Sequence, residues 1–282
     1  MNDMTLLTNS WDFPVETVEL TASKVGDCNL YNVPASMARG IMRTDTNEML
    51  GVHGSKYRAI KHDDVVNSIF DAISSANISK DFNHKIEVFD NGAKMRGTID
   101  FDDLVIAPAL NDHIKFQIIF FNSYDGSWSF GQQAQGLRLW CLNGCTTPDT
   151  IAKTMAKHTT NVNVTASASK IEAGLDSFFN SKSKYQQWMQ EKLEHETAER
   201  FFKATLAKVK TPQTKDKWNN KQLDSLMSCW RKESRVLGNN KWALYNACTY
   251  WATHTNESSS PANTRRLREN QLAKFLPTLE MA

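Results

Sequence analysis

The stretch Phe116–Thr147 constrains the fold more than any other part of the sequence. It begins with the apolar run Phe116–Phe121, continues through an Asp125-Gly126 turn signal and returns through an aromatic segment to Leu137–Leu142. Asp-Gly supplies the positive φ angles that a tight hairpin turn needs, and Phe, Ile and Trp favour the half-buried surface of a sheet. The stretch therefore predicts a β-meander at the centre of the fold.

The last strand of this meander is expected to have an apolar face and a cationic face. Side chains alternate across a strand, so Leu137 and Leu139 should share one face while Arg138 and Trp140 share the other. The first pair resembles a core-facing surface. The second pair places a cation beside an aromatic ring.

A second hairpin is predicted over residues 85–101. Asn91-Gly92 is a strong short-range hairpin signal, and alternating residues flank it on both sides. On its second arm Met95 and Ile99 are expected to face the core, whereas Arg96 should lie on the opposite, cationic face with Lys94.

Helices are predicted on either side of these strands. Asp63 and Asp64 precede apolar residues at helical spacing, which predicts a helix of about sixteen residues. Thr147-Pro148 is expected to start a helix that carries Lys153 and Lys157. From Ile171 an aromatic stripe runs at helical spacing for about forty residues, and two further aromatic helices precede Pro261 and a basic tail.

These elements predict an α+β fold in the order α-β-β-β-α, with an antiparallel β-meander core followed by a mostly helical C-terminal half. Residues 160–169 are small and polar, so we expect the boundary between two domains there, at 1–162 and 163–282. The aromatic helices of the second domain are expected to pack on the sheet or to form subunit contacts.

The composition is that of a globular intracellular protein. The 282 residues are 40% hydrophobic, which is enough for a substantial core. No run approaches eighteen apolar residues and the N-terminus lacks a secretory signal, so we expect a cytoplasmic protein without a membrane span. Five scattered cysteines are typical of reduced thiols.

Charge is distributed unevenly along the chain. Residues 1–162 contain 14 Lys and Arg against 19 Asp and Glu, whereas residues 163–282 contain 19 against 12. Lys203–Arg235 alone holds nine basic and three acidic residues. A positive stripe of this kind would attract a polyanion, although a solvated helix face has the same composition, and both interpretations stay open.

The sequence gives little support to catalysis or to a metal centre. Cys141 and Cys145 lack the second ligand pair of a structural zinc site, even if His53, His84, His113 and His158 are considered. His195-Glu196 lacks the second histidine of the zinc protease motif, and neither a phosphate loop nor a nucleophile elbow occurs. We therefore expect a protein that is not an enzyme and needs no cofactor or metal. One alternative is magnesium-dependent phosphodiester cleavage by the aspartates Asp100, Asp102, Asp103, Asp112 and Asp125.

Basic and aromatic residues interleave at several positions, as at Lys56-Tyr57-Arg58 and Arg138-Leu139-Trp140. Proteins bind single-stranded nucleic acid with cations that follow the phosphates and with rings that stack on bases. The residues expected to bind nucleic acid are Lys56, Arg58, Arg96, Arg138, Trp140, Lys153 and Lys157.

Several blocks of sequence carry a resemblance to a known family. They are Asn32–Ser36, Ile41–Asn47, Leu50–Tyr57, Asn122–Ser127, Leu139–Asn143 and Lys241–Ala247. In this order they resemble the phage and plasmid family catalogued as domain of unknown function 932. The resemblance covers about residues 32 to 260, and it implies a phage or mobile-element protein without implying an activity.

The predicted order of elements is also similar to the core of the single-strand annealing proteins, such as Redβ and Erf. That resemblance implies a homo-oligomeric ring or filament that binds single-stranded DNA in a basic groove and needs no nucleotide. By analogy the groove would involve Arg96, Arg138, Lys153 and Lys157.

Together these features predict a phage single-stranded DNA-binding and annealing protein that acts in recombination in the host cytoplasm. Two alternatives are a mobile-element effector that binds a host defence protein and a metal-dependent nuclease.

Overall fold

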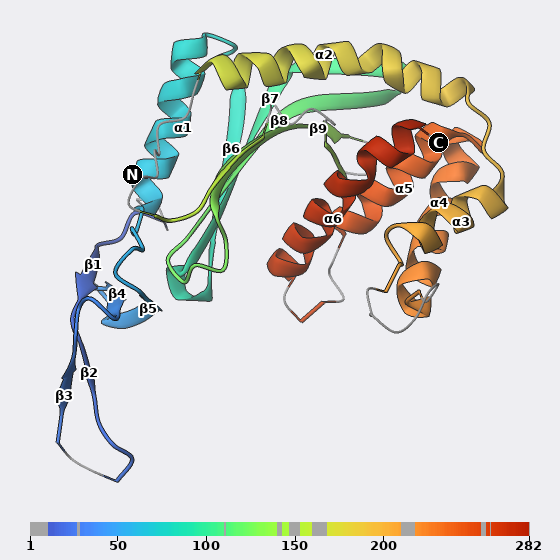
Figure 1. The fold of residues 1–282 in the computed structure, drawn as a ribbon. Coiled ribbons are helices and arrows are strands. Elements are labelled where there is room, and N and C mark those ends of the chain that lie inside the picture. The colour runs from blue at the N-terminus through green and yellow to red at the C-terminus, as the bar shows by residue number, and fades with distance from the viewer. Residues whose placement is uncertain are drawn as a thin grey trace, which may run out of the picture. The chain divides into compact units, whose positions relative to one another are not determined.

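A computed structural model describes residues 11–26, 29–109, 111–139, 143–146, 153–159, 168–209, 218–254, 258–259 and 261–281 (Figure 1). The strands are β1 Val15–Val18, β2 Leu20–Ala22, β3 Tyr31–Val33, β4 Arg39–Arg43, β5 Glu48–His53, β6 Phe82–Phe89, β7 Lys94–Ala109, β8 Asp112–Ser123, β9 Phe130–Arg138, β10 Asn143–Thr146 and β11 Lys153–Ala156. The helices are α1 His62–Ala76, the short 3-10 helix η1 Asp90–Gly92, α2 Ala168–Gln190, α3 His195–Ala204, α4 Asn220–Leu237, α5 Lys241–Thr253 and α6 Pro261–Met281. The α+β class is confirmed, with strands in the first half and helices after them.

The strands form three sheets. The largest has the order β10-β9-β8-β7-β6, and β11 also pairs with β9. A three-stranded sheet has the order β1-β4-β5, and β2 pairs with β3 alone. Among the described residues, no helix is both long and apolar enough to cross a membrane.

The chain divides into two compact units, each built from three segments. Unit 1 comprises Met1–Asp102, Gln117–Ala134 and Ile151–Gly174. Unit 2 comprises Asp103–Phe116, Gln135–Thr150 and Leu175–Ala282. The sequence predicts a single boundary near residue 162 instead, because composition does not reveal that β7, β8 and β9 each contribute to both units.

The hairpin around Asn91-Gly92 is confirmed. β6 and β7 pair antiparallel, with Phe89 opposite Lys94. Asp90, Asn91 and Gly92 in η1 have φ angles of 52°, 56° and 100°. This left-handed backbone is the conformation that Asn and Gly adopt most readily, so the turn residues fix the register of the pair.

The prediction of a helix after Pro148 is wrong for the residues of that segment that the structure describes. Lys153–Ala156 forms β11, which pairs antiparallel with β9 and places Lys153 opposite Gln133. Strand pairing satisfies the backbone groups of this segment, and that non-local gain outweighs the local helix-start signal. Between α1 and α2 the described chain contains six strands, β6 to β11, where the predicted α-β-β-β-α order has three.

The aromatic stripe from Ile171 forms two helices where one long helix was predicted. Between α2 and α3 the backbone pairs with the residues that lead into α5: Leu193 N–H donates to Asn239 O at 3.1 Å, and Lys241 N–H donates to Glu191 O at 2.9 Å. These bonds compensate for the missing helical bonds. Further along, the expected basic tail is the helix α6, which begins at Pro261, a residue well suited to a first helical position.

The aromatic side chains of unit 2 pack helix against helix, as the stripes predict. The ring centroids of Tyr185 in α2 and Trp242 in α5 are 4.5 Å apart, and those of Trp188 and Tyr245 are 5.3 Å apart. Phe178 of α2 packs on Phe116 of β8 at 5.3 Å. Figure 1 shows α3, α4, α5 and α6 grouped together in the C-terminal part of the chain.

A buried ionic network lies in the core of unit 2. The Arg138 side chain from β9 donates through Nε to Asp112 Oδ1 at 2.5 Å and through Nη1 to Glu233 Oε2 at 2.9 Å. Trp242 Nε1 donates to Asp112 Oδ2 at 2.9 Å. Arg138 and Glu233 are 1% and 5% exposed. The network therefore links two strands to α4 and α5 through side chains that are almost fully shielded from solvent.

Breaking this network should destabilise the protein strongly. Arg138 pairs with both Asp112 and Glu233, so removing it takes the cationic partner from two buried carboxylates, and loss of one partner of a buried ion pair costs on the order of 3–5 kcal/mol. We expect Arg138→Ala to lower the free energy of unfolding by about that amount or more in urea denaturation. Glu199→Ala, which removes a partly exposed pair with Lys203, is the control and should cost far less, because solvent screens exposed ion pairs. Similar losses in both variants would contradict this account.

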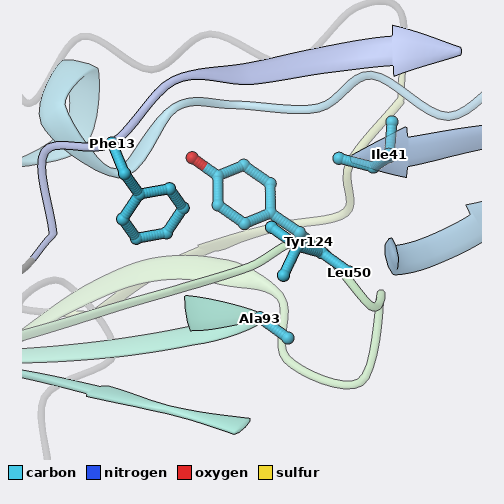
Figure 2. Close-up of a cluster of buried hydrophobic side chains, with 5 residues drawn as sticks. All are labelled: Phe13, Ile41, Leu50, Ala93 and Tyr124. Carbon is cyan, nitrogen blue, oxygen red and sulfur yellow. The ribbon is translucent and has the colours of Figure 1, made fainter. Parts of the chain in front are cut away.

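Unit 1 has an apolar cluster formed by Phe13, Ile41, Leu50, Ala93 and Tyr124 (Figure 2). Next to it, the fully buried His62 at the start of α1 contacts Gly92 O through Nε2 at 2.9 Å and Asn122 Nδ2 through Nδ1 at 2.9 Å. The carbonyl accepts and the amide donates, so the ring is held as a neutral tautomer. Burial lowers the pKa of His62 to about 4.

This histidine should make the fold sensitive to mild acid. The unfolded chain protonates His62 near pH 6.5, whereas the folded chain does so only near pH 4. The contribution of His62 to stability is therefore lost as the pH falls from about 6.5 to about 4. We expect the free energy of unfolding to fall by about 2 kcal/mol between pH 7 and pH 5 through this group alone. His62→Gln should have a shallower pH dependence in urea denaturation, and an unchanged slope would refute the assignment.

Candidate nucleic-acid interface

Three of the seven residues predicted to bind nucleic acid lie together in unit 1, around a stack of rings. β5 ends at His53, and a tight turn follows in which Tyr57 N–H donates to Gly54 O at 3.0 Å. The turn folds Tyr57 back onto His53, and their rings stack with centroids 3.6 Å apart and planes 10° apart. Lys56 and Arg58 flank Tyr57 in the sequence, and both are exposed.

The segment after β11 completes this arrangement. Thr159 forms an isolated antiparallel bridge with Tyr57, and Arg58 N–H donates to His158 O at 3.4 Å. The ring of His158 stacks with that of Tyr57 at 5.2 Å. Because Lys157 precedes His158 and is exposed, the bridge brings a third cation to the two beside Tyr57. We call His53, Tyr57 and His158 the ring stack.

Backbone carbonyl groups at the end of β8 and in the loop that follows it contact the ring stack. His53 Nε2 lies 2.6 Å from Tyr124 O, and Tyr57 Oη donates to Ser123 O at 2.9 Å. A Cβ at Gly51 would approach Tyr124 O to 2.4 Å, and one at Gly126 would approach His53 Cε1 to 2.9 Å. Two glycines thus allow this loop to contact the ring stack closely.

Two open hollows border the ring stack. One has a volume of about 310 Å³ and is lined by Arg39, His53, Tyr57 and Arg58. The other, of about 380 Å³, is lined by Met37, Lys56, Tyr57 and His158. Gly54, Ser55 and Tyr57 line both. The surface therefore combines hollows, aromatic rings and cations.

The electrostatics of this surface favour an anion. Arg39, Lys56, Arg58 and Lys157 are all exposed, and none forms an ion pair within the part of the chain that the structure describes. The nearby carboxylate of Asp125 forms an ion pair with Lys94 at 3.2 Å. The hydrogen bonds from Ser127 and the charge of Lys94 together lower the pKa of Asp125 despite its burial.

His158 is buried, and its ring has few polar contacts. It is 6% exposed, and among the described residues neither ring nitrogen has a partner at good hydrogen-bond geometry, although the backbone of Arg58 and Trp128 lies near the ring. Burial lowers its pKa, although the carbonyl groups of Arg58 and Trp128 partly oppose that change. The histidine is therefore neutral near pH 7 and serves as an aromatic ring in the stack.

The other predicted binding residues do not join this surface. Arg138 belongs to the buried network of unit 2, and Arg96 is 4% exposed, with its guanidinium 5.3 Å from the ring centroid of Phe121. The prediction that Arg138 lies on a cationic outer face and Leu139 on the core face is therefore wrong. Arg138 is buried, and Leu139 is 39% exposed. Arg96 likewise lies inside the protein. Trp140 and the side chain of Lys153 lie outside the described residues.

The structure also offers no cluster for a metal-dependent nuclease among the residues that it describes. Asp112 binds Arg138, Asp125 binds Lys94, Asp100 accepts from Gln117, and Asp102 accepts from Asn83. Four of the five aspartates considered from the sequence are thus engaged in separate contacts.

Sequence reasoning identified three of the four cations on this surface, Lys56, Arg58 and Lys157, and one of its three rings, Tyr57. His53 and His158 are singled out in the sequence only as possible metal ligands, and Arg39 is not singled out at all. The Lys56-Tyr57-Arg58 triplet signals one strand of the site. The pairing of Tyr57 with Thr159 depends on how distant strands come together, and a local sequence pattern does not reveal that.

The family described as "Domain of unknown function (DUF932)" matches residues 49–274. The chain belongs to this family. The match includes the whole ring stack, β6 to β11 and most of α6. No curated protein and no solved structure matches the chain. The proposed function of this DUF932 protein therefore depends on its own residues.

The contact between Gly126 and His53 gives a stability prediction. Gly126 has φ 70°, and a side chain there would be strained and would also press on His53. Gly26 has φ 83° with nothing within 4 Å of an added Cβ, so Gly26→Ala measures the strain alone. We expect Gly126→Ala to cost at least about 1 kcal/mol more than Gly26→Ala in thermal or urea unfolding. Equal costs would show that the loop does not pack on the ring stack.

Proposed function

We propose that this protein binds single-stranded DNA on the surface around the ring stack, and that it acts as an annealing protein in phage recombination. The observation that carries the proposal is the Tyr57–Thr159 bridge, because it gathers Lys56, Arg58 and Lys157 around aromatic rings. Cations that follow phosphates and rings that contact bases are the combination used by proteins that bind single strands.

Binding would begin with the phosphates. The exposed cations attract the strand and release its counterions, whatever the base sequence. The hollows beside Tyr57 then accept nucleobases against the side chains of His53 and Tyr57. Such contacts are sequence-tolerant and are worth on the order of 1–3 kcal/mol per base. A strand held mainly by its phosphates keeps bases available to pair with a complementary strand.

Annealing adds a requirement for several copies of the protein along one strand. We infer a ring or filament by analogy with the annealing proteins, which the order of elements predicted from the sequence resembles. A single surface with a few cations binds weakly, and linking several such surfaces multiplies the affinity through effective concentration. Mass photometry with and without an oligonucleotide tests assembly directly.

The proposal predicts a charge-reversal effect limited to this surface. We expect Arg58→Glu with Lys157→Glu to weaken binding of a labelled single-stranded oligonucleotide at least about tenfold in fluorescence anisotropy. The slope of log affinity against log salt should also become shallower by about 0.7 for each lost phosphate contact. Lys80→Glu with Lys192→Glu makes the same charge change at exposed residues that line neither hollow and is the matched control.

Two outcomes would reject this assignment. Equal weakening by the control pair would mean that only net charge matters. If the unaltered protein did not bind the single-stranded oligonucleotide at low salt, the proposed function would be wrong.

A second candidate is a protein-binding effector, and the β2–β3 hairpin favours it. Val25, Leu30 and Tyr31 are 108%, 71% and 46% exposed on this hairpin. Large apolar side chains gathered at the surface often mark a site for a protein partner. In Figure 1 the hairpin extends away from β1, β4 and β5. The oligonucleotide titration separates this candidate from DNA binding.

A further inference from the structure

The three-stranded sheet β1-β4-β5 has apolar side chains on both of its faces. One face contributes Ile41 to the apolar cluster of unit 1 (Figure 2). Because side chains alternate along a strand, Gly40 and Met42 of β4 lie on the opposite face. Their partners across the ladder are Val52 and Met49 of β5, which are 55% and 48% exposed. The second face of such a sheet is usually solvated and polar, so this exposed apolar face indicates a surface that a partner covers.

β1 continues this second face. Val18 lies opposite Gly40, and Glu16 lies opposite Met42. A Cβ at Gly40 would approach Met49 Sδ to 2.8 Å and Val18 Cγ2 to 2.9 Å, so both side chains close over the glycine. The apolar side chains are therefore contiguous, with the exposed Glu16 beside them. We call Glu16, Val18, Met42, Met49 and Val52 the outer face of the sheet.

The β2–β3 hairpin also has an apolar face. One side of it carries four apolar side chains, which the register pairs as Leu20 with Val33 and Ala22 with Tyr31. Near the tip, Val25 and Leu30 are 108% and 71% exposed. Each strand has only three residues, and a two-stranded hairpin is at best marginally stable without a surface to pack against. The hairpin extends away from β1, β4 and β5 (Figure 1), and it leaves the outer face of its own chain exposed.

The two faces carry opposite charges. Lys24 lies two residues after β2, and its Nζ is 5.7 Å from the centroid of the Tyr31 ring, which places the ammonium on the apolar side of the hairpin. Glu16 supplies the carboxylate of the outer face. Both are exposed, and neither forms an ion pair with any residue in the described ranges. A cation on one apolar face and a carboxylate on the other make the two faces electrostatically complementary.

We propose that the β2–β3 hairpin of one copy packs on the outer face of a second copy of this chain. Each copy carries both halves of the contact and covers neither half by itself. A second copy therefore covers both faces at once, whereas a foreign protein would have to match each of them separately. Reciprocal exchange of hairpins gives a dimer, and exchange in one direction gives a ring or filament. The inference goes beyond DNA binding at the ring stack and does not depend on it.

The test measures self-association of the full-length protein without DNA, by mass photometry and sedimentation velocity. Val52→Lys on the outer face and Leu30→Glu at the hairpin tip each add a charge of the same sign as the charge on the opposing face. We expect each variant to weaken self-association at least about tenfold, because the added charge is desolvated without a partner. Val236→Lys is the matched control, since Val236 is 59% exposed and belongs to α4 of unit 2.

A charge exchange tests whether the two faces meet between copies. Glu16→Lys and Lys24→Glu should each weaken self-association about fivefold, because each places like charges on the two faces. Combining the two substitutions should restore self-association, since the contact then has the same pair with its signs exchanged. A double variant that stays as weak as the single ones would contradict this arrangement.

Thermal unfolding checks that every variant is folded, and Leu30→Glu lies outside both strands of the hairpin. Three outcomes would overturn the inference. They are a protein that stays monomeric at micromolar concentration, self-association that persists in both Val52→Lys and Leu30→Glu, and an equal loss in Val236→Lys. None of them concerns the binding of an oligonucleotide to a single copy, which the titration described above decides separately.

Discussion

The buried pairing of Arg138 with Asp112 and Glu233 is the interaction on which the rest of unit 2 depends. A guanidinium inside a core is tolerable only when its charge and its donors are satisfied in fixed geometry. Two carboxylates meet that demand here, and Trp242 satisfies the remaining oxygen of Asp112. The strands β8 and β9 and the helices α4 and α5 must therefore take one arrangement, because any other would leave a charge unpaired. Aromatic packing between α2 and α5 then fills the space around them.

Unit 1 achieves similar specificity with neutral groups. His62 accepts a hydrogen bond from Asn122 Nδ2 beside an apolar cluster, and the carbonyl of Tyr124 lies 2.6 Å from His53 Nε2. The rings of the candidate interface thus rest on a polar core that is itself constrained. The cations Arg39, Lys56, Arg58 and Lys157 are exposed around these rings. Rings in fixed positions beside exposed cations fit the proposed binding of single-stranded DNA.

Local patterns predicted the elements that are governed by local physics. The Asn91-Gly92 hairpin follows from backbone preference at two residues, and α1 follows from the spacing of Val65, Val66 and Ile69. The predictions that failed concern residues whose structure depends on partners far away in the sequence. Arg138 looks solvent-facing in its own segment, and only Asp112 and Glu233 make its burial possible. Lys153 looks helical beside Pro148, and only β9 makes it a strand residue. The candidate interface was predicted in part for the same reason. Lys56, Tyr57 and Arg58 are adjacent in the sequence, whereas the ring stack needs His158, which is distant in the sequence.

The long sequence separation within the Arg138 network also shapes how the protein is made. Asp112 and Arg138 leave the ribosome well before Glu233 and Trp242, which lie in α4 and α5. Until those helices are synthesised, Arg138 and Asp112 can pair with each other, but Arg138 lacks the carboxylate of Glu233 and Asp112 lacks the indole of Trp242. The nascent chain must therefore hold an incomplete sheet through much of translation, and chaperones that recognise exposed strands have their opportunity in that interval.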